Sequence, residues 1–460
     1  MITTTYALTP ILAQEEVATY NAFEAIAFIL LGLLLFSWVG RGMATKEDRD
    51  WFPGLMMWGF IAKMLGSLAR FYMVTGIYRD GDSFTYHSIG RIMANVWRGF
   101  VVPTSNSSAG TATAEQITGF LYAPYSPSML GGFLIFALVA FTGQLLFYAA
   151  GRHWLKGHQL RMYAVAVFFF PSLIFWPSSI GKDALMLFFL GLAAYGASRM
   201  LRYYQFSALL YAAPGLYFAS LIRSHVAAVM GLAIALAALF GRAPKEYRAS
   251  PKRAFVIVVV LAGAAFALST FSATFGVSVD GGGETQDPEA FLADVSERTA
   301  TGGSEVEGGA VGSPAQLPGA VIKVLYRPLI YEARSFQQLA SAMEGTILLV
   351  ITVWKLPTMW RRKRLLREKP MLLLAFFYTG GFIIGFSAIL NLGILARQRI
   401  QVLPLFFLLL VGLGWDETRP RKGPTRRRLE DTEVQPATPE LESAGAGRHE
   451  TEPEPDAIPQ

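Results

Sequence analysis

"SMLGGFLIFALVAFTGQLLFYAA", residues 128–150, contains no charged side chain and is long enough, as a helix, to cross a lipid bilayer. About 20 apolar residues span a hydrocarbon core about 30 Å thick, because a helix rises about 1.5 Å per residue. Similar runs recur along a chain that is 53% hydrophobic and 16% charged, whereas soluble domains carry about 25% charged residues. The sequence therefore predicts an all-α, polytopic integral membrane protein rather than a barrel of short alternating strands.

Apolar runs of this kind predict about eleven transmembrane helices. They lie near residues 22–39, 54–76, 128–150, 162–179, 183–199, 206–222, 224–241, 254–275, 345–360, 370–391 and 400–415. Pro171 and Pro177 are expected to kink or end the fourth. The first run follows Glu15 and Glu16 rather than a basic segment, so we expect a retained helix and not a cleaved signal peptide.

Lysine and arginine gather in alternate connections between these runs, which predicts the orientation. The basic segments are "GRGMATKEDRD", "GRHWLKGHQLR", "RMLRYYQ", "GRAPKEYRASPKR", "RRKRLLREK" and "RPRKGPTRRR". Because basic loops stay in the cytoplasm, the C-terminus is expected inside and the N-terminus outside. Residues 1–416 then form one membrane domain, with interfacial helices in the external loops 77–127 and 276–344. Residues 417–460 are too poor in large apolar side chains to order themselves, and we expect a disordered cytoplasmic tail.

Composition also excludes several classes of site. No cysteine is present, and the five histidines show no metal-ligand spacing. The net charge of +7 comes from basic residues between apolar runs, so it predicts topology rather than nucleic-acid binding. We expect a multi-pass protein of the bacterial plasma membrane, with the lipid bilayer as its first partner.

The stretch "IYRDGDSFTYHSIGR", residues 77–91, places several polar side chains directly after an apolar run. Asp80 and Asp82 flank Gly81, and such a pair suits either a divalent cation (Mg²⁺ or Mn²⁺) or a general base near an alcohol. A helix is expected to begin here, with Asp82 or Ser83 as its N-cap. A capped turn with solvated charges is the plain structural alternative.

Other expected external segments carry more arginine than external loops usually do. The guanidinium group binds phosphate in a bidentate manner, so the set suits a lipid-linked phosphate at headgroup depth. The candidate substrate-binding residues are Tyr86, Arg91, Lys182, Asp183, Arg223, His225, Arg327, Glu332, Arg397 and Arg399. Two alternatives stay open: Lys182 and Asp183 pair with each other, or single arginines bind ordinary anionic headgroups.

The segments "DGDSFTY" and "RQRIQVLP" resemble parts of the GT-C superfamily of polytopic membrane glycosyltransferases. The resemblance implies that a sugar passes from a polyprenyl-phosphate donor to a glycan or protein acceptor on the extracytoplasmic face. It implies that Asp82, or else Asp80, serves as base or metal ligand, that Tyr86 lines the site, and that Arg397 and Arg399 contact the lipid phosphate. The acidic loop follows the second apolar run here, whereas it usually follows the first in that family.

Two other functions compete with a glycosyltransferase. A polysaccharide polymerase or ligase of cell-envelope glycan assembly is also polytopic and arginine-dependent, but takes its donor on a lipid diphosphate. A transporter would place charges near the middle of the membrane. Lys63, Arg70 and Lys355 lie within apolar runs, and Lys63 and Arg70 share a helix face that would line a polar cavity.

Overall fold

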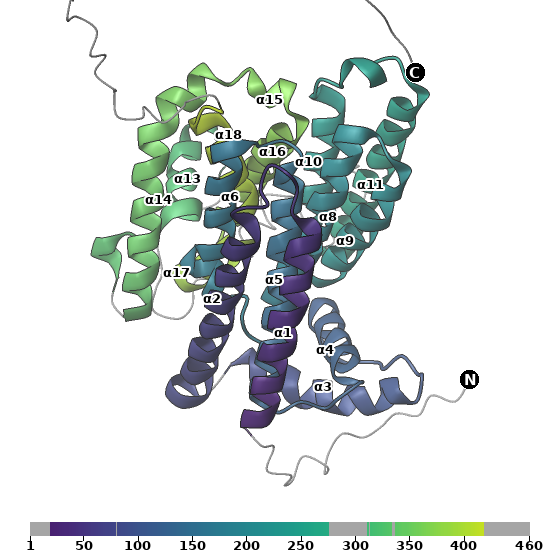
Figure 1. The fold of residues 1–460 in the computed structure, drawn as a ribbon, viewed down its shortest axis with the longest axis vertical. Helices are drawn as coiled ribbons and strands as arrows, with labels where there is room; N and C mark the ends of the chain where they lie inside the picture. The colour runs from purple at the N-terminus through teal and green to yellow at the C-terminus, as the bar shows by residue number, and fades with distance from the viewer. Residues whose placement is uncertain (1–18, 80, 276–310, 312, 334–335, 418–460) are drawn as a thin grey trace, which may run out of the picture. The chain divides into compact units, whose positions relative to one another are not determined.

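A computed structural model describes residues 19–79, 81–275, 311, 313–333 and 336–417 (Figure 1). Of the described residues, 80% are helical and none lies in a β-strand, which confirms the all-α prediction. The helices are α1 (Ala22–Met43), α2 (Phe52–Tyr72), α3 (Asp82–Arg98), α4 (Ala109–Tyr122), α5 (Met129–Arg152), α6 (Gly157–Phe169), α7 (Pro171–Phe175), α8 (Lys182–Tyr203), α9 (Leu209–Ile222), α10 (Ser224–Phe240), α11 (Pro251–Phe275), α13 (Leu317–Tyr326), α14 (Phe336–Arg361), α15 (Leu365–Glu368), α16 (Pro370–Phe386), α17 (Leu392–Gln398) and α18 (Leu403–Gly414). The described residues up to Glu417 form one compact unit, and the predicted disordered tail lies outside the described residues.

Each expected span overlaps at least one helix, although the fourth and the last are interrupted. Among the described residues, five helices are long and apolar enough to cross a membrane, and a sixth span results if a bent pair is counted as one. The five are Ala22–Met43, Phe52–Tyr78, Met129–Arg152, Lys182–Tyr203 and Gln338–Arg361. Large apolar side chains also face outward on α1 and α14, as at Leu34 (70% exposed) and Trp354 (67% exposed). These features fit an integral membrane protein whose apolar helices contact the bilayer.

The core is built around α5, which packs most extensively against α8, and α8 in turn packs against α9. Gly143 on α5 lets the two backbones approach closely: a Cβ there would lie 2.5 Å from the carbonyl oxygen of Leu187. Small residues at helix contacts are the usual means of close packing in membranes. This tight α5–α8 pair holds the start of α8, where the candidate site lies.

The fourth expected span is broken, as its prolines predict. α6 ends at Phe169, α7 begins at Pro171, and irregular backbone then leads to α8. Non-helical backbone in a membrane is tolerated only where its polar groups are satisfied. Lys63 Nζ donates to Leu173 O at 2.7 Å, and Ser67 Oγ donates to Ser178 O at 3.3 Å. Lys63, inside the second apolar run, therefore satisfies a carbonyl oxygen of the broken span.

The loop after α2 contains two packed helices, α3 and α4 (Figure 1). The π-helical extension of α2 (Met73–Tyr78) leads into this loop. Trp97 Nε1 on α3 donates to Gln116 O on α4 at 3.0 Å. The predicted N-cap was wrong: Asp82 is the first residue of α3 and Gly81 holds the cap position. Ser83 does not cap the helix because its Oγ donates to Ile180 O at 3.0 Å, which docks α3 against the start of α8.

The last expected span is also interrupted. α17 and its 3₁₀ extension (Arg399–Gln401) meet α18 at an angle of 64°. Arg397 thus lies on a short helix that is set across the axis of α18. This bend turns the late arginines toward other helices.

Candidate functional site

Asp183 occupies the centre of a charged cluster at the start of α8. Its side chain is 3% exposed, and both carboxylate oxygens accept hydrogen bonds. Arg223 Nη2 donates to Oδ1 at 2.9 Å, and Arg397 Nε donates to Oδ2. The first turn of a helix also favours a negative charge. Three segments far apart in the sequence therefore meet at one carboxylate.

Arg397 extends this cluster to the beginning of α3. Its Nη1 lies 3.6 Å from Asp82 Oδ2, while its Nε is bound to Asp183. The Asp82 side chain is 66% exposed, in contrast to the enclosed Asp183. One arginine thus joins a buried carboxylate, engaged on both oxygens, to an exposed one that keeps an open face.

Lys182 and Tyr86 complete the surroundings. Lys182 Nζ donates to Thr111 Oγ1 of α4 at 2.8 Å rather than to Asp183, so the alternative in which Lys182 and Asp183 pair with each other is wrong. Tyr86 is buried, and burial raises the pKa of its hydroxyl to about 12, although a hydrogen bond with Thr111 opposes this rise. The Tyr86 ring packs against Gly181: a Cβ at position 181 would lie 3.3 Å from the ring. Gly181 also has φ +142°, a backbone conformation that favours glycine. We call Asp82, Lys182, Asp183, Arg223 and Arg397 the Asp183 cluster.

Arg70 adds a further cation beside the cluster. Its guanidinium lies over the rings of Phe175 and Trp176, 5.1 and 4.9 Å from their centroids. It also interacts electrostatically with Arg397 and Asp183. Together with the Asp183 cluster it brings four cationic side chains next to two carboxylates. Such an excess of positive charge at a helix end suits an anionic ligand.

Arg327 and Arg399, with Glu332, lie elsewhere. Arg327 Nε donates to Glu332 Oε1 at 2.7 Å. Although partial burial opposes ionisation, hydrogen bonds from Arg327 and from the Leu329 N–H lower the pKa of Glu332 below its usual value. Arg399 is fully buried and reaches Glu344 Oε1 at 3.4 Å. The structure thus does not bring these three residues to the Asp183 cluster, and their substrate-binding roles stay predictions.

Arg91 and His225 are near the cluster in sequence but are arranged differently. His225, on the first turn of α10, lies beside Phe386, with ring centroids 5.5 Å apart and ring planes tilted by 48°. Arg91 lies on α3 near His87, whose Nδ1 is 3.1 Å from the Tyr122 hydroxyl. Burial, with the charge of Arg91, lowers the pKa of His87 to about 4. His87 is therefore neutral at pH 7 and serves the α3–α4 contact.

The metal prediction rests on Asp80 and Asp82. Asp80 lies outside the described residues. Within the described ranges, no group of three or more His, Cys, Asp or Glu side chains is placed to hold a metal ion. Asp82 offers an exposed carboxylate of the type that Mg²⁺ or Mn²⁺ prefers, and the divalent-cation site stays a prediction.

Arg70 and Thr111 were not among the predicted site residues. An arginine within an apolar run is itself a signal of function or of a specific partner. The sequence alone could therefore have indicated Arg70 as a site residue. Thr111 lies in the small-residue stretch "SSAGTATAEQ", where nothing in the local pattern distinguishes it. Only the packing of α4 against α8 and α9 brings it to Lys182.

Comparisons of the chain with protein-family models, with curated proteins and with solved structures found no match.

Proposed function

We propose that the protein is a membrane glycosyltransferase that takes a sugar from a polyprenyl-phosphate donor on the extracytoplasmic face. The observation that carries this proposal is Asp82: an exposed carboxylate 3.6 Å from Arg397, within a cluster rich in arginine. A transferase of this kind needs a base near the acceptor hydroxyl and cations near the departing phosphate. The Asp183 cluster supplies both within one group of side chains.

In the proposed reaction the acceptor oxygen attacks the anomeric carbon as the bond from that carbon to the phosphate oxygen breaks. Asp82 accepts the proton of the acceptor hydroxyl, and the polyprenyl phosphate leaves with the bonding electron pair. Arg397 and Lys182 are placed to stabilise the charge that develops on this phosphate. Asp183 does not act as the base in this scheme, because two arginines already engage its oxygens. Its role is to hold Arg223 and Arg397 in position.

The proposal includes eleven spans in the bacterial plasma membrane, with the N-terminus and the Asp183 cluster outside and the C-terminus inside. It is supported by the apolar helices of the described residues, five or six of which are long and apolar enough to cross a membrane. It is also supported by the charge distribution, because "RRKRLLREK" lies in the connection between α14 and α16. Labelling of single cysteines with a membrane-impermeant reagent tests the orientation at two exposed positions, Arg98 and Arg361. Arg98→Cys should be labelled from outside the cell and Arg361→Cys should not.

A polymerase or ligase that uses a lipid diphosphate is the second candidate. The observation that favours it is the number of cations: Arg70, Lys182, Arg223 and Arg397 lie beside only two carboxylates. A diphosphate offers more charge for such a set than a monophosphate does. A transporter gains no such support, because Lys63 binds Leu173 O and Lys355 lies between the rings of Trp354 and Trp415.

The test is transfer of radiolabelled sugar in proteoliposomes that contain the purified full-length protein. Lipid monophosphate and lipid diphosphate donors are offered in parallel, each with a mixture of glycan and peptide acceptors. We expect Asp82→Asn to reduce transfer by about 10²- to 10⁴-fold, the usual contribution of a general base. The control is Asp50→Asn, the same change at an exposed aspartate in the α1–α2 connection, which should leave the rate unchanged.

The outcomes separate the candidates. Transfer from the monophosphate that is lost in Asp82→Asn supports the proposal. Transfer from the diphosphate alone favours the polymerase or ligase. Full activity in Asp82→Asn removes Asp82 as the base, and uptake of labelled substrate without any transfer identifies a transporter.

A further inference from the structure

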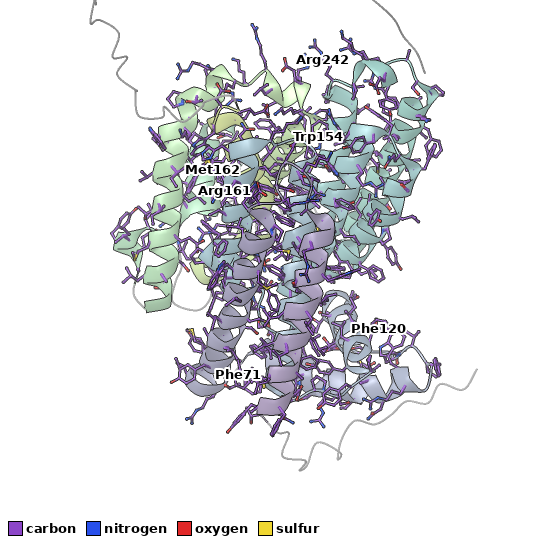
Figure 2. The ribbon with its side chains drawn as sticks, in the orientation of Figure 1. Phe71, Phe120, Trp154, Arg161, Met162 and Arg242 are labelled. Atoms are coloured by element: carbon purple, nitrogen blue, oxygen red, sulfur yellow. The ribbon has the colours of Figure 1, made fainter. Side chains whose placement is uncertain are left out.

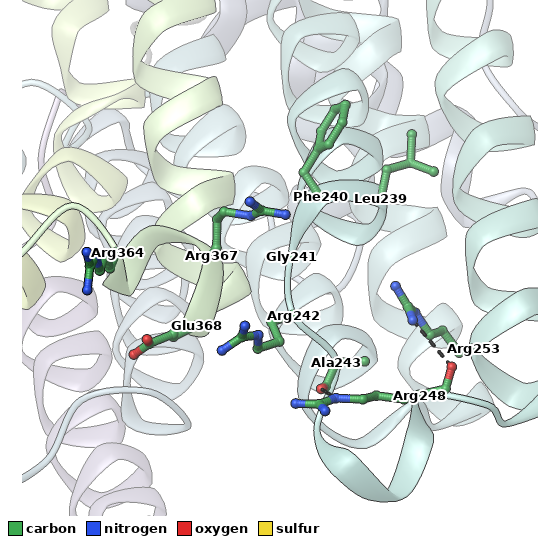
Figure 3. Close-up of a pocket in the computed structure, with 10 residues that line it drawn as sticks. All are labelled: Leu239, Phe240, Gly241, Arg242, Ala243, Arg248, Arg253, Arg364, Arg367 and Glu368. Atoms are coloured by element: carbon green, nitrogen blue, oxygen red, sulfur yellow. Dashed lines mark hydrogen bonds between the residues drawn. The ribbon is translucent and has the colours of Figure 1, made fainter.

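Five arginines surround one pocket that the proposed function does not use. The pocket has a volume of about 630 Å³ and lies between the end of α10, the segment that follows it, the start of α11, and α15 (Figure 3). Its arginines are Arg242, Arg248, Arg253, Arg364 and Arg367, and its one lining carboxylate is Glu368. Ligand pockets commonly have volumes of about 300–1,000 Å³. We call this the basic pocket.

The basic pocket is held together by backbone contacts between distant segments. The Arg242 N–H donates to Arg367 O at 2.7 Å, which ties the end of α10 to α15. Gly241 makes this approach possible: a Cβ there would lie 2.4 Å from Ala237 O and 2.8 Å from Pro370 Cβ. The arginines are therefore brought together by a specific junction of the fold rather than by a flexible tail.

The guanidinium groups of the basic pocket are poorly neutralised. Arg248 and Arg253 donate to carbonyl oxygens at 3.3 and 3.4 Å, and Arg253 Nε is buried without a hydrogen-bond partner (Figure 3). The side chains of Arg242, Arg364 and Arg367 form no hydrogen bond or ion pair with any described residue. Since several like charges repel each other, this arrangement favours an anionic occupant with several acceptor oxygens.

Apolar side chains at the mouth indicate what carries that anion. Leu239 and Phe240 line the pocket on the last turn of α10, and they are 40% and 55% exposed. The Phe240 ring lies 6.5 Å from that of Phe377 on α16. A basic pocket with an apolar edge, at the end of an apolar helix, matches a headgroup with attached acyl chains.

The basic pocket and the Asp183 cluster lie at opposite ends of α10. Arg223 immediately precedes this helix of 17 residues, and Phe240 is its last residue. At about 1.5 Å per residue the ends are about 25 Å apart, close to the thickness of a hydrocarbon core. In Figure 2, Arg242 lies near the top of the view, whereas Phe71 and Phe120 lie near the bottom. The two sites therefore face opposite membrane surfaces if α10 crosses the bilayer.

We propose that the basic pocket binds the phosphate headgroup of an anionic membrane lipid. The planar guanidinium forks of Arg242, Arg364 and Arg367 hold the phosphate oxygens, and Leu239 and Phe240 contact the first part of the acyl chains. This proposal does not rest on the glycosyltransferase proposal, because none of these residues belongs to the Asp183 cluster.

Two measurements test whether the basic pocket binds an anionic lipid: native mass spectrometry and fluorescence titration. Both use the full-length protein, purified into neutral phosphatidylcholine nanodiscs. The probe is labelled phosphatidylglycerol. The variant Arg242→Gln/Arg364→Gln/Arg367→Gln should bind it about 100-fold more weakly, at about fivefold for each arginine. The matched control, Arg41→Gln/Arg49→Gln/Arg361→Gln, removes three other exposed arginines from basic segments. It should change binding by less than about threefold, because none of these side chains lines the pocket and salt screens exposed charges away from the ligand.

Three further results bear on the proposal. An equal loss in the two triple variants overturns it, because the attraction is then a diffuse effect of basic segments. Displacement of the probe by inorganic phosphate at the concentration of the lipid also overturns it, because the site then takes a free phosphate compound. Retention of part of the affinity in the matching triple lysine variant supports it and shows that a loss is not due to misfolding.

Discussion

Replacing Asp183 with asparagine should destabilise the protein far more than the same change at Asp82. Both oxygens of Asp183 are bound to arginines and its side chain is 3% exposed. Removing one partner of a buried ion pair costs about 3–5 kcal/mol, because the remaining charge is left buried without compensation. In Asp183→Asn an amide N–H₂ would also face one of two guanidinium groups, and both are donors.

Asp82 provides the matched comparison. Its carboxylate is 66% exposed and lies 3.6 Å from Arg397. Exposed pairs of this kind contribute about 0–1 kcal/mol, since water replaces the partner and salt screens it. We therefore expect a difference of at least about 2 kcal/mol in unfolding free energy between two variants that carry an identical chemical change.

The assay is equilibrium unfolding of the full-length protein in mixed micelles, with SDS as denaturant. The variant Asp183→Asn/Arg223→Gln completes a double-mutant cycle and should show a coupling energy of at least about 1 kcal/mol. Equal destabilisation by Asp183→Asn and Asp82→Asn would refute the reasoning. So would a coupling energy near zero, because Asp183 would then not be the residue that holds the arginines.

Two further predictions concern the neighbours of the cluster. His87 has a pKa lowered by burial to about 4, against 6.5 when unfolded, so the unfolded chain binds the extra proton between these values. The contribution of His87 to the free energy of unfolding is complete above pH 6.5 and should fall by about 3 kcal/mol as the pH approaches 4. Hydrogen exchange of residues 82–98 measures this loss, and His87→Phe should reduce it. Gly181→Ala should cost about 1–3 kcal/mol in the same SDS assay because φ is +142° there, whereas Gly42→Ala, where a Cβ has open space, should be neutral or slightly stabilising.

The positions of the long apolar helices follow closely from the sequence, because each depends on local hydropathy. The apolar run 128–150 corresponds to α5 (Met129–Arg152), and Pro171 marks the break between α6 and α7. The N-cap of α3 could not be predicted in this way. Asp82 and Ser83 are both good caps in isolation, but the carbonyl of Ile180, far away in the sequence, takes the Ser83 hydroxyl.

Pairing within the site depends on tertiary contacts that no local pattern contains. Lys182 and Asp183 are adjacent and opposite in charge, and a local interpretation pairs them. Side chains at neighbouring helical positions point about 100° apart. Lys182 therefore reaches Thr111 on α4 while Asp183 turns inward to Arg223. Helical geometry indicates that the two side chains separate, but the identity of each partner requires the fold.

Arg397 and Arg399 show how the same geometry assigns different tasks to similar residues. Two positions apart on a helical turn, they point about 200° from each other, so both cannot face one ligand. Arg399 is fully buried and reaches Glu344, whose other oxygen accepts the N–H of Ser172 in α7. This chain of contacts connects the bend before α18 with α14 and with the broken fourth span. Because the rotation of α17 is thereby set, Arg399 positions Arg397 against Asp183 and Asp82 without contacting either carboxylate.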